Sequence, residues 1–183
     1  MKTISPKDLN NLQLQTLLQT AIAPRPIALA STIDKDGNIN LSPFSFFNMF
    51  SSNPPVVIFS PARRVRDNTT KHTLENVLEI PEVVIGIVNF KIVQQISLAS
   101  TEYEKGVNEF VKSGLTMKDS DVVRPKLIDD CPVNLECKVL EIKHLGTEGG
   151  AGNLVICEIL KIHVREEYLN EEGNLDQMKL DLV

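Results

Sequence analysis

The chain has 183 residues, of which 42% are hydrophobic and 23% are charged, and its formal net charge at pH 7 is −5. This length and composition predict one globular domain, residues 1–183, with a core of its own. The acidic balance argues against nucleic acid or an anionic membrane as the main partner, and no stretch reaches the roughly 18 uninterrupted apolar residues of a transmembrane helix.

The cysteines and the first residues of the chain favour a cytoplasmic protein. The N-terminal sequence MKTISPKDLNNLQLQ lacks the apolar run of a signal peptide. Cys131, Cys137 and Cys157 show no metal-ligand spacing, and an odd number of cysteines cannot form a complete set of disulfides. Because Cys137 and Cys157 lie in apolar runs, we expect buried free thiols, which suit a reducing compartment.

The first third of the chain predicts a helix followed by a β-hairpin. Residues 8–20 place leucines close to one helical face, and residues 24–33 form a proline-led apolar run typical of a buried strand. The sequence DKDGN at residues 34–38 holds an Asp-Gly pair between apolar runs, which is a strong hairpin signal. A short β-branched run at residues 56–60 predicts a core strand.

The rest of the chain is rich in strands joined by short helices. Residues 68–80 predict a helix with Asn68 or Thr69 as its N-cap, and Gly114 is expected to close a later helix. The remaining elements are expected at residues 82–90 (strand), 91–100 and 107–114 (short helices), and 133–146 and 153–165 (long strands, the first with a bulge or a change of face). This order predicts a mainly β fold with helical inserts, a closed or nearly closed antiparallel barrel, with a doubly wound sheet as the weaker alternative.

One stretch, residues 60–77, is basic in an otherwise acidic chain. Arg63, Arg64, Arg66 and Lys71 lie within nine residues, among hydroxyl and amide side chains. The stretch follows a strand and leads into a helix N-terminus, where free N–H groups and the helix dipole favour an anion such as phosphate. A solvated loop with helix caps is the alternative interpretation.

A second stretch, SPFSFFNMFSSNPP at residues 42–55, holds four of the seven phenylalanines among small polar residues. Phe44 and Phe46 fit the core of a hairpin. Apolar rings beside small polar groups also suit a planar heteroaromatic ligand with a hydrogen-bonding edge. A phosphate site and a flat-ring site in one small barrel together predict a nucleotide-like cofactor.

These stretches belong to five ordered blocks, namely APRPIALASTIDKDGNINLSPFSFFN, PPVVIFSPARR, KHTLENV, GVNEFVKSGLT and CPVNLECKV. In that order they resemble the flavin reductase-like family, which includes flavoredoxin-like proteins and the reductase components of two-component monooxygenases. The resemblance runs from about residue 20 to the C-terminus. It implies a six-stranded Greek-key split barrel, a homodimer, and FMN rather than FAD bound non-covalently near the dimer interface.

The resemblance also implies a set of cofactor-binding residues. The flavin phosphate would be held by Arg63, Arg64, Lys71 and Thr73, beside His72, where the family more often carries Asp. The isoalloxazine ring would be lined by Ser45, Phe46, Phe47 and Asn48. The site would be completed by Arg25, Pro26, Ser31 and Thr32, with Ser60 and Asn89 as neighbours.

In such proteins the flavin carries the chemistry, receiving hydride at N5 from a nicotinamide and passing electrons onward. No catalytic side chain is therefore assigned, and the protein need supply only position, a hydrogen bond near N5 and a dry slot. His72, His144 and His163 are too scattered in the sequence for a metal site, and the last two are expected to be ordinary polar residues on strands.

Two departures from the family keep the function open. Many family reductases carry Gly-Asp-His before the final strand, associated with the nicotinamide donor, and here the position reads Gly150, Ala151 and Gly152. Relatives also continue past a segment like MKLDLV into a further tail. Three hypotheses remain: an FMN-dependent oxidoreductase using NAD(P)H, a flavoredoxin-like carrier reduced by a protein partner, or a flavin-binding protein without turnover. A monooxygenase or another redox protein is the expected partner.

Overall fold

A computed structural model describes residues 1–183, and its centre is a seven-stranded antiparallel sheet. The strand order is β2-β1-β5-β8-β9-β4-β3, and a separate pair, β6 and β7, lies outside this sheet. The strands are β1 (Ala28–Ile33), β2 (Ile39–Phe44), β3 (Phe47–Ser52), β4 (Pro55–Phe59), β5 (Glu82–Ile87), β6 (Met117–Lys118), β7 (Leu127–Ile128), β8 (Val133–His144) and β9 (Asn153–Val164). The helices are α1 (Asn11–Ala21), α2 (His72–Glu79), α3 (Val93–Ala99), α4 (Glu109–Ser113) and α5 (Gln177–Leu180), with 3-10 turns at Pro6–Asp8, Phe90–Ile92 and Glu166–Tyr168.

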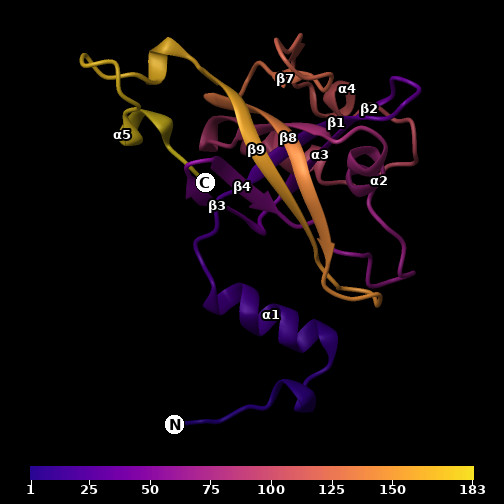
Figure 1. Cartoon of the computed structure of the whole chain (residues 1–183). Helices are drawn as coiled ribbons and strands as arrows, with labels where there is room; N and C mark the ends of the chain where they lie inside the picture. The colour runs from indigo at the N-terminus through magenta and orange to yellow at the C-terminus, as the bar shows by residue number, and fades with distance from the viewer.

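The sheet curves so far that its two edges come together without pairing. β2 and β3 stand at opposite ends of the strand order, yet only Ser45 and Phe46 separate them in the chain. Two residues span only about 10 Å even when extended, so the sheet must bend back on itself to bring these strands close. The result is a barrel-like sheet (Figure 1), and it stays unclosed because β2 and β3 do not pair.

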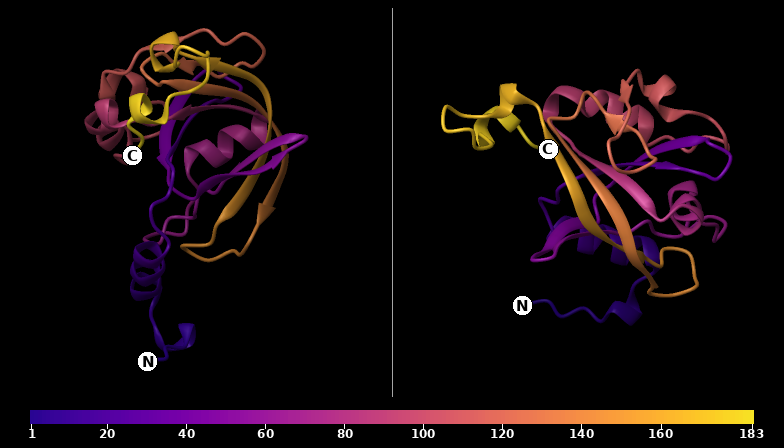
Figure 2. Two further views of the ribbon diagram at one scale, coloured as in Figure 1. Left: turned by 90° about the vertical axis from the view of Figure 1, so that its left-hand side faces the viewer. Right: turned by 45° about the horizontal axis from the view of Figure 1, so that its top comes forward.

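The alternation of side chains along each strand divides the core into two layers. On β1, Ala28 and Ala30 face the inner cluster, whereas Leu29 between them faces the outer one. Helix α2 contributes Leu74 and Val77 to the inner cluster and therefore closes the concave side of the sheet (Figure 2). Helices α3 and α4 cover the opposite side with an outer cluster.

The longest hairpin, β8 and β9, crosses the whole body and projects a glycine-rich loop, residues 145–152, beyond it (Figure 1). The predicted bulge is confirmed, because the β8–β9 register shifts between Glu136 and Cys137 and again between Val139 and Glu141. Cys131, Cys137 and Cys157 are free and buried, as expected for the last two.

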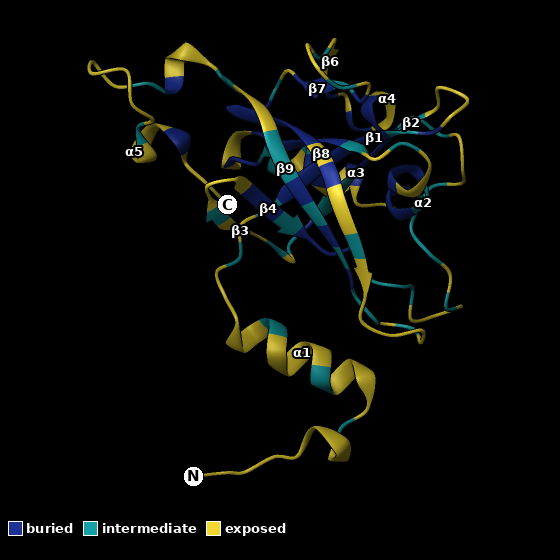
Figure 3. Ribbon diagram, in the orientation of Figure 1, coloured by how far each residue is buried: buried dark blue, intermediate teal, exposed yellow.

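Helix α1 stands apart from this body (Figures 1 and 3). Asn10 caps it in a reciprocal pair with Gln13, whose side chain accepts from the Asn10 backbone N–H. The helix predicted at residues 8–20 is thus confirmed, but none of its residues is buried, and Leu12 is 72% exposed. No helix of the chain combines the length and apolarity needed to cross a membrane.

Three expectations differ from the structure. The sheet has seven strands instead of six, and it is unclosed, which fits the nearly closed barrel and not the closed one of the two predicted forms. Its antiparallel order rules out the doubly wound alternative. Helix α2 begins after Lys71, not after Asn68 or Thr69, because Asn68 adopts a left-handed conformation (φ 56°) inside the preceding turn. Phe46 is 42% exposed and so is not a core residue, whereas Phe44 is buried.

Candidate functional site

Residues 60–71 form the loop between β4 and α2, the basic loop. Two backbone bonds close its central turn: the Arg64 N–H donates to the Thr69 carbonyl and the Asn68 N–H donates to the Arg64 carbonyl, both at 2.9 Å. The Asp67 carboxylate accepts from the N–H and hydroxyl of Thr69, which brings the pKa of Asp67 down to about 2. These contacts give the loop a defined shape.

The glycine-rich β8–β9 loop packs directly on the basic loop. The Arg63 N–H donates to the Ala151 carbonyl at 2.9 Å, and the Gly150 N–H donates to the Arg63 carbonyl at 3.0 Å. A Cβ on Gly149 would lie 3.0 Å from the Val65 Cα, and a Cβ on Gly152 would lie 2.7 Å from the Ser60 Oγ. Glycine at these two positions is what allows the backbones to approach so closely.

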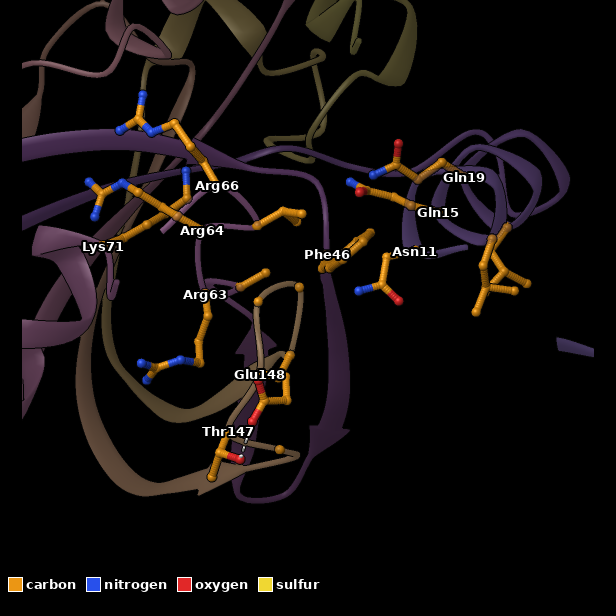
Figure 4. A pocket seen from close by; sticks show the side chains of 18 of the residues that line it. Asn11, Gln15, Gln19, Phe46, Arg63, Arg64, Arg66, Lys71, Thr147 and Glu148 are labelled. Atoms are coloured by element: carbon orange, nitrogen blue, oxygen red, sulfur yellow. Dashed lines mark hydrogen bonds between the residues drawn. The ribbon is translucent and has the colours of Figure 1, made fainter. Parts of the chain in front are cut away.

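A cavity of about 1030 Å³ opens between helix α1, the basic loop and the β8–β9 loop (Figure 4). Asn11, Gln15 and Gln19 approach it from α1, and Phe46 stands between α1 and the basic residues. The cavity is also lined by Leu14, Leu18, Ile22, Arg25, Ala62, Arg63, Arg64, Val65, Arg66, Lys71, Glu102 and residues 146–151. The volume falls in the range of ligand and cofactor sites, and its lining joins an apolar side to a cationic side.

Three of the four cations in the basic loop already have partners. The Arg63 guanidinium donates to the Asn68 side chain at 2.7 Å and to the Asn68 carbonyl, and it points away from Arg64 and Arg66 (Figure 4). Arg64 and Arg66 both contact the carboxylate of Glu102. Arg63 therefore shapes the loop, while the other two arginines face a carboxylate.

Lys71 is the cation without a partner. Its ammonium makes no ion pair or hydrogen bond, lies 5.6 Å from the centre of the Phe44 ring, and is partly buried. Burial, together with the nearby Arg64 charge, lowers the pKa of Lys71 below its usual value. A partly buried cation with no counter-ion favours an anionic ligand.

The N-terminus of α2 adds unpaired donors beside Lys71. No side chain caps this eight-residue helix, and the backbone N–H groups of His72 and Thr73 have no acceptor. The helix dipole makes this end favourable for negative charge. Burial lowers the pKa of His72 below its usual value.

A smaller, polar cavity of about 270 Å³ lies on the other side of the same side chains. Arg64, Lys71 and Glu102 line both cavities. The other residues around the smaller one are Asn40, Ser42, His72, Ser100, Thr101, Tyr103 and Glu109. The cationic side chains therefore stand between an apolar cavity that suits a ring and a polar pocket that suits a charged group.

Comparison with known proteins gives this arrangement a family. A family model described as "Flavin reductase like domain" matches residues 20–179. The chain belongs to the flavin reductase-like family. It is 35% identical to a protein of Aquifex aeolicus described only as uncharacterized, over 94% of this chain and 86% of that one.

Two solved structures of similar proteins support the same assignment. Nitrilotriacetate monooxygenase component B from Bacillus cereus superposes with a TM-score of 0.91 at 27% identity, covering 98% of this chain and 89% of that one. The 2-nitrobenzoate 2-nitroreductase NbaA from Pseudomonas fluorescens superposes with a TM-score of 0.83 at 26% identity, covering 95% and 82%.

Of the residues that the family resemblance implied, five line the large cavity: Arg25, Phe46, Arg63, Arg64 and Lys71. The Arg25 guanidinium donates to the carbonyls of Gln19 (2.6 Å) and Ile22, so it ties the end of α1 to the start of the sheet. It also reaches the Ser45 Oγ at 3.5 Å, which places Ser45 at the rim.

Three residues beside this rim point elsewhere. Pro26 is exposed and lines neither cavity. Phe47 packs against the inner cluster, and the exposed Asn48 on β3 accepts from the neighbouring Met49 N–H at 2.8 Å.

The remaining predicted residues are buried and line neither cavity. Thr73 accepts from Asn40 at 2.9 Å, and Thr32 accepts from Asn76 at 3.1 Å. Ser60 is buried against Gly152. The set that sequence reasoning placed here is therefore split between the cavity and the packing behind it.

Ser31 and Asn89 are buried with one side-chain oxygen each that has no partner. The Asn89 amide donates to the Tyr168 hydroxyl at 3.1 Å and lies against the C-terminal segment, where Asn89 forms a bridge with Leu182. In this chain Asn89 therefore connects β5 to the C-terminal residues and not to the cavity.

Sequence reasoning missed Glu102 and the contribution of helix α1. Glu102 lies 38 residues from Arg64, and nothing in its local sequence distinguishes it from other exposed acidic residues. Asn11, Gln15 and Gln19 of α1, spaced by four residues, also line the cavity, but a polar row is ordinary on a surface helix, so nothing in the sequence indicated this role.

Proposed function

We propose that the large cavity binds FMN and that the protein is an FMN-dependent oxidoreductase of the flavin reductase-like family. The observation that carries the proposal is Lys71, a partly buried cation without a counter-ion, next to the uncapped N-terminus of α2 and inside a cavity of about 1030 Å³. A phosphate monoester supplies the missing negative charge, and the adjoining apolar side suits a flat ring.

The residues divide the work of binding between them. Lys71, Arg64 and the free N–H groups of His72 and Thr73 bind the phosphate, whereas Arg63 keeps the loop in shape through Asn68. A site for one phosphate group suits FMN better than FAD, which carries two. On the ring side, Phe46 and Arg25 bound the cavity, and Ser45 stands at its rim.

The flavin, when bound, accepts two electrons as hydride and passes them on to an acceptor. The chain contributes position and exclusion of water. The apolar side chains of Leu14 and Leu18 on α1, and of Ile22 after it, line the cavity, so they would cover one side of a bound ring. No side chain of the cavity is needed as a proton donor for this role.

Two sources of electrons are compatible with the cavity. NAD(P)H is the first, and an acceptor protein such as a monooxygenase component would follow it, as in the name of the Bacillus cereus neighbour. A protein donor is the second, and the β8–β9 loop favours it. Where many family reductases carry Gly-Asp-His, this chain has Gly150, Ala151 and Gly152, and Ser60 fills the space behind Gly152.

Three further properties belong to the same proposal. We expect residues 1–183 to act as one domain, and two copies to form a homodimer. The free, buried cysteines suit a reducing cytoplasm.

The test is flavin retention followed by an anaerobic NADH titration. The protein is incubated with FMN or riboflavin, desalted, and examined for the visible flavin band. We expect FMN to be retained better than riboflavin; loss of both, or equal retention, would refute the phosphate site. Retained FMN that bleaches with NADH identifies a nicotinamide-dependent reductase. Retained FMN that bleaches only with a reduced iron–sulfur protein identifies a carrier with a protein donor.

A further inference from the structure

The carboxylate of Glu102 forms ion pairs with two arginines of the basic loop, Arg64 and Arg66. Its Oε1 contacts the Arg64 Nε, and its Oε2 lies 3.3 Å from the Arg66 Nη2. One carboxylate thus bridges two guanidinium groups, as two oxygens of a phosphate would. Glu102 also lines both the 1030 Å³ cavity and the 270 Å³ cavity, so it stands at their junction.

Arg64 and Glu102 differ in how firmly the rest of the protein holds their side chains. The Arg64 side chain is only 18% exposed and also donates to the Thr69 hydroxyl at 3.1 Å and to the Thr70 carbonyl. Glu102 is 46% exposed, accepts a hydrogen bond only from Arg64, and otherwise contacts only the Arg66 guanidinium as an ion pair. If the contact opens, the carboxylate moves and Arg64 stays in place.

The segment that carries Glu102 is held near the basic loop independently of the arginines. Lys105, three residues further on, forms an ion pair with Glu75 of α2 at 3.5 Å. Glu75 in turn accepts from the Thr70 hydroxyl at 2.7 Å. The backbone can therefore stay where it is while the Glu102 side chain swings into solvent.

We propose that Glu102 is an internal competitor for the flavin phosphate. It neutralises Arg64 and Arg66 in the ligand-free protein, and an incoming phosphate displaces it. This inference rests on the proposed function and concerns how that site is regulated. A carboxylate that must be displaced lowers the affinity for FMN and speeds its release, so the flavin exchanges through the site.

A competitor of this kind acts only on ligands that carry a phosphate. Riboflavin has the same ring and ribityl chain but leaves Arg64 and Arg66 to Glu102. The predicted effect of Glu102 is therefore a change in the ratio of FMN to riboflavin affinity. A residue that merely supported the fold would change both affinities together.

The experiment compares Glu102→Gln with Glu104→Gln in the full chain. Glu104 is exposed, lies in the same segment and forms no ion pair, so its substitution makes the same charge change without the bridge. Dissociation constants for FMN and riboflavin are measured by quenching of flavin fluorescence, and FMN release is followed by stopped flow. A thermal melt checks that each variant is folded.

For Glu102→Gln we expect the FMN dissociation constant to fall by about tenfold and FMN release to slow, since one charge-assisted contact no longer competes. Riboflavin affinity, and both affinities of Glu104→Gln, should change by less than about twofold, as for an exposed charge. An unchanged or weaker FMN affinity in Glu102→Gln overturns the competitor. That failure leaves the proposed function intact as long as the wild type still prefers FMN to riboflavin; loss of that preference refutes the proposed function itself.

Discussion

Glu136 and Lys71 are two charged side chains that the fold withdraws from water, and they are treated in opposite ways. The Glu136 carboxylate is fully buried and accepts from the N–H groups of Asp121, Val122 and Val123 at 2.7–3.0 Å and from the His163 ring at 2.6 Å. The Lys71 ammonium is partly buried and, apart from the face of the Phe44 ring, has neither an ion-pair nor a hydrogen-bond partner. A buried charge normally requires compensation, so the first is part of the scaffold and the second awaits a ligand.

The pKa values follow the same division. Burial alone raises the pKa of the Glu136 carboxyl, but its N–H donors and His163 bring it below its usual range. Asp121, Glu136 and His163 offer atoms within 4.8 Å of one another, yet the oxygens of Glu136 are already used by these donors. The cluster therefore pins the 121–123 turn onto β8.

The largest expected effect comes from removing the buried, fully hydrogen-bonded carboxylate of Glu136. Glu136→Ala leaves the three N–H groups of the 121–123 turn and the His163 ring without their buried acceptor, and we expect the free energy of unfolding to drop by about 3 kcal/mol or more. Glu141→Ala, on an exposed position of the same strand, is the matched control. Urea unfolding followed by circular dichroism measures both; equal stability of the two variants would show that Glu136 is no anchor.

A substitution at Lys71 should have the opposite result: it should weaken FMN binding without lowering the stability of the fold. Lys71→Met removes an uncompensated charge but keeps the length of the side chain, so stability should stay the same or rise slightly. FMN affinity should fall by about 2 kcal/mol, the contribution of a hydrogen bond to a charged group, with riboflavin affinity unchanged. Calorimetric titration with both flavins tests this, and a parallel loss of stability would place Lys71 in the scaffold.

The comparison also explains what could be predicted from the sequence. The basic loop was predictable because its cations are neighbours in the chain, between a β-branched strand and an amphipathic helix. The bulge in β8 was predictable because the alternation of its apolar residues breaks at Val139 and Leu140.

The state of each cation was not predictable from the same stretch. Arg63 turns to Asn68 because that residue takes a left-handed conformation, which also delays the start of α2. Arg64 and Arg66 meet Glu102 through a tertiary contact that spans more than 35 residues. Local sequence reports which charges are present, whereas tertiary packing decides which of them remain free.

A smaller effect is expected from pH. Because burial and Arg64 lower the pKa of Lys71, the ligand-free protein loses this charge at a lower pH than an ordinary lysine. A bound phosphate favours the ammonium form, so FMN affinity is highest below the lowered pKa and falls as pH rises through it. The loss is up to about tenfold per pH unit. Lys71→Arg keeps its charge throughout and should flatten the profile in the alkaline range where Lys71 deprotonates; a slope common to both proteins would assign the titration to another group.

The smallest effect is expected at Arg66, the most exposed of the four cations. Its side chain is 75% exposed, and its contacts are to Asp67 and Glu102. Exposed pairs are weak and screened by salt, so Arg66→Ala should change FMN affinity by about twofold at physiological ionic strength and somewhat more at low salt. Two opposing consequences keep the change small: a cation is lost from the cavity, and Glu102 loses one of the two partners that hold it there. Fluorescence titration at two salt concentrations measures this, and a loss as large as that of Lys71→Met would mean that Arg66 reaches the phosphate itself. In that case an exposed cation that already has partners would bind the ligand, and neither exposure nor pairing would separate ligand-binding charges from surface charges in this loop.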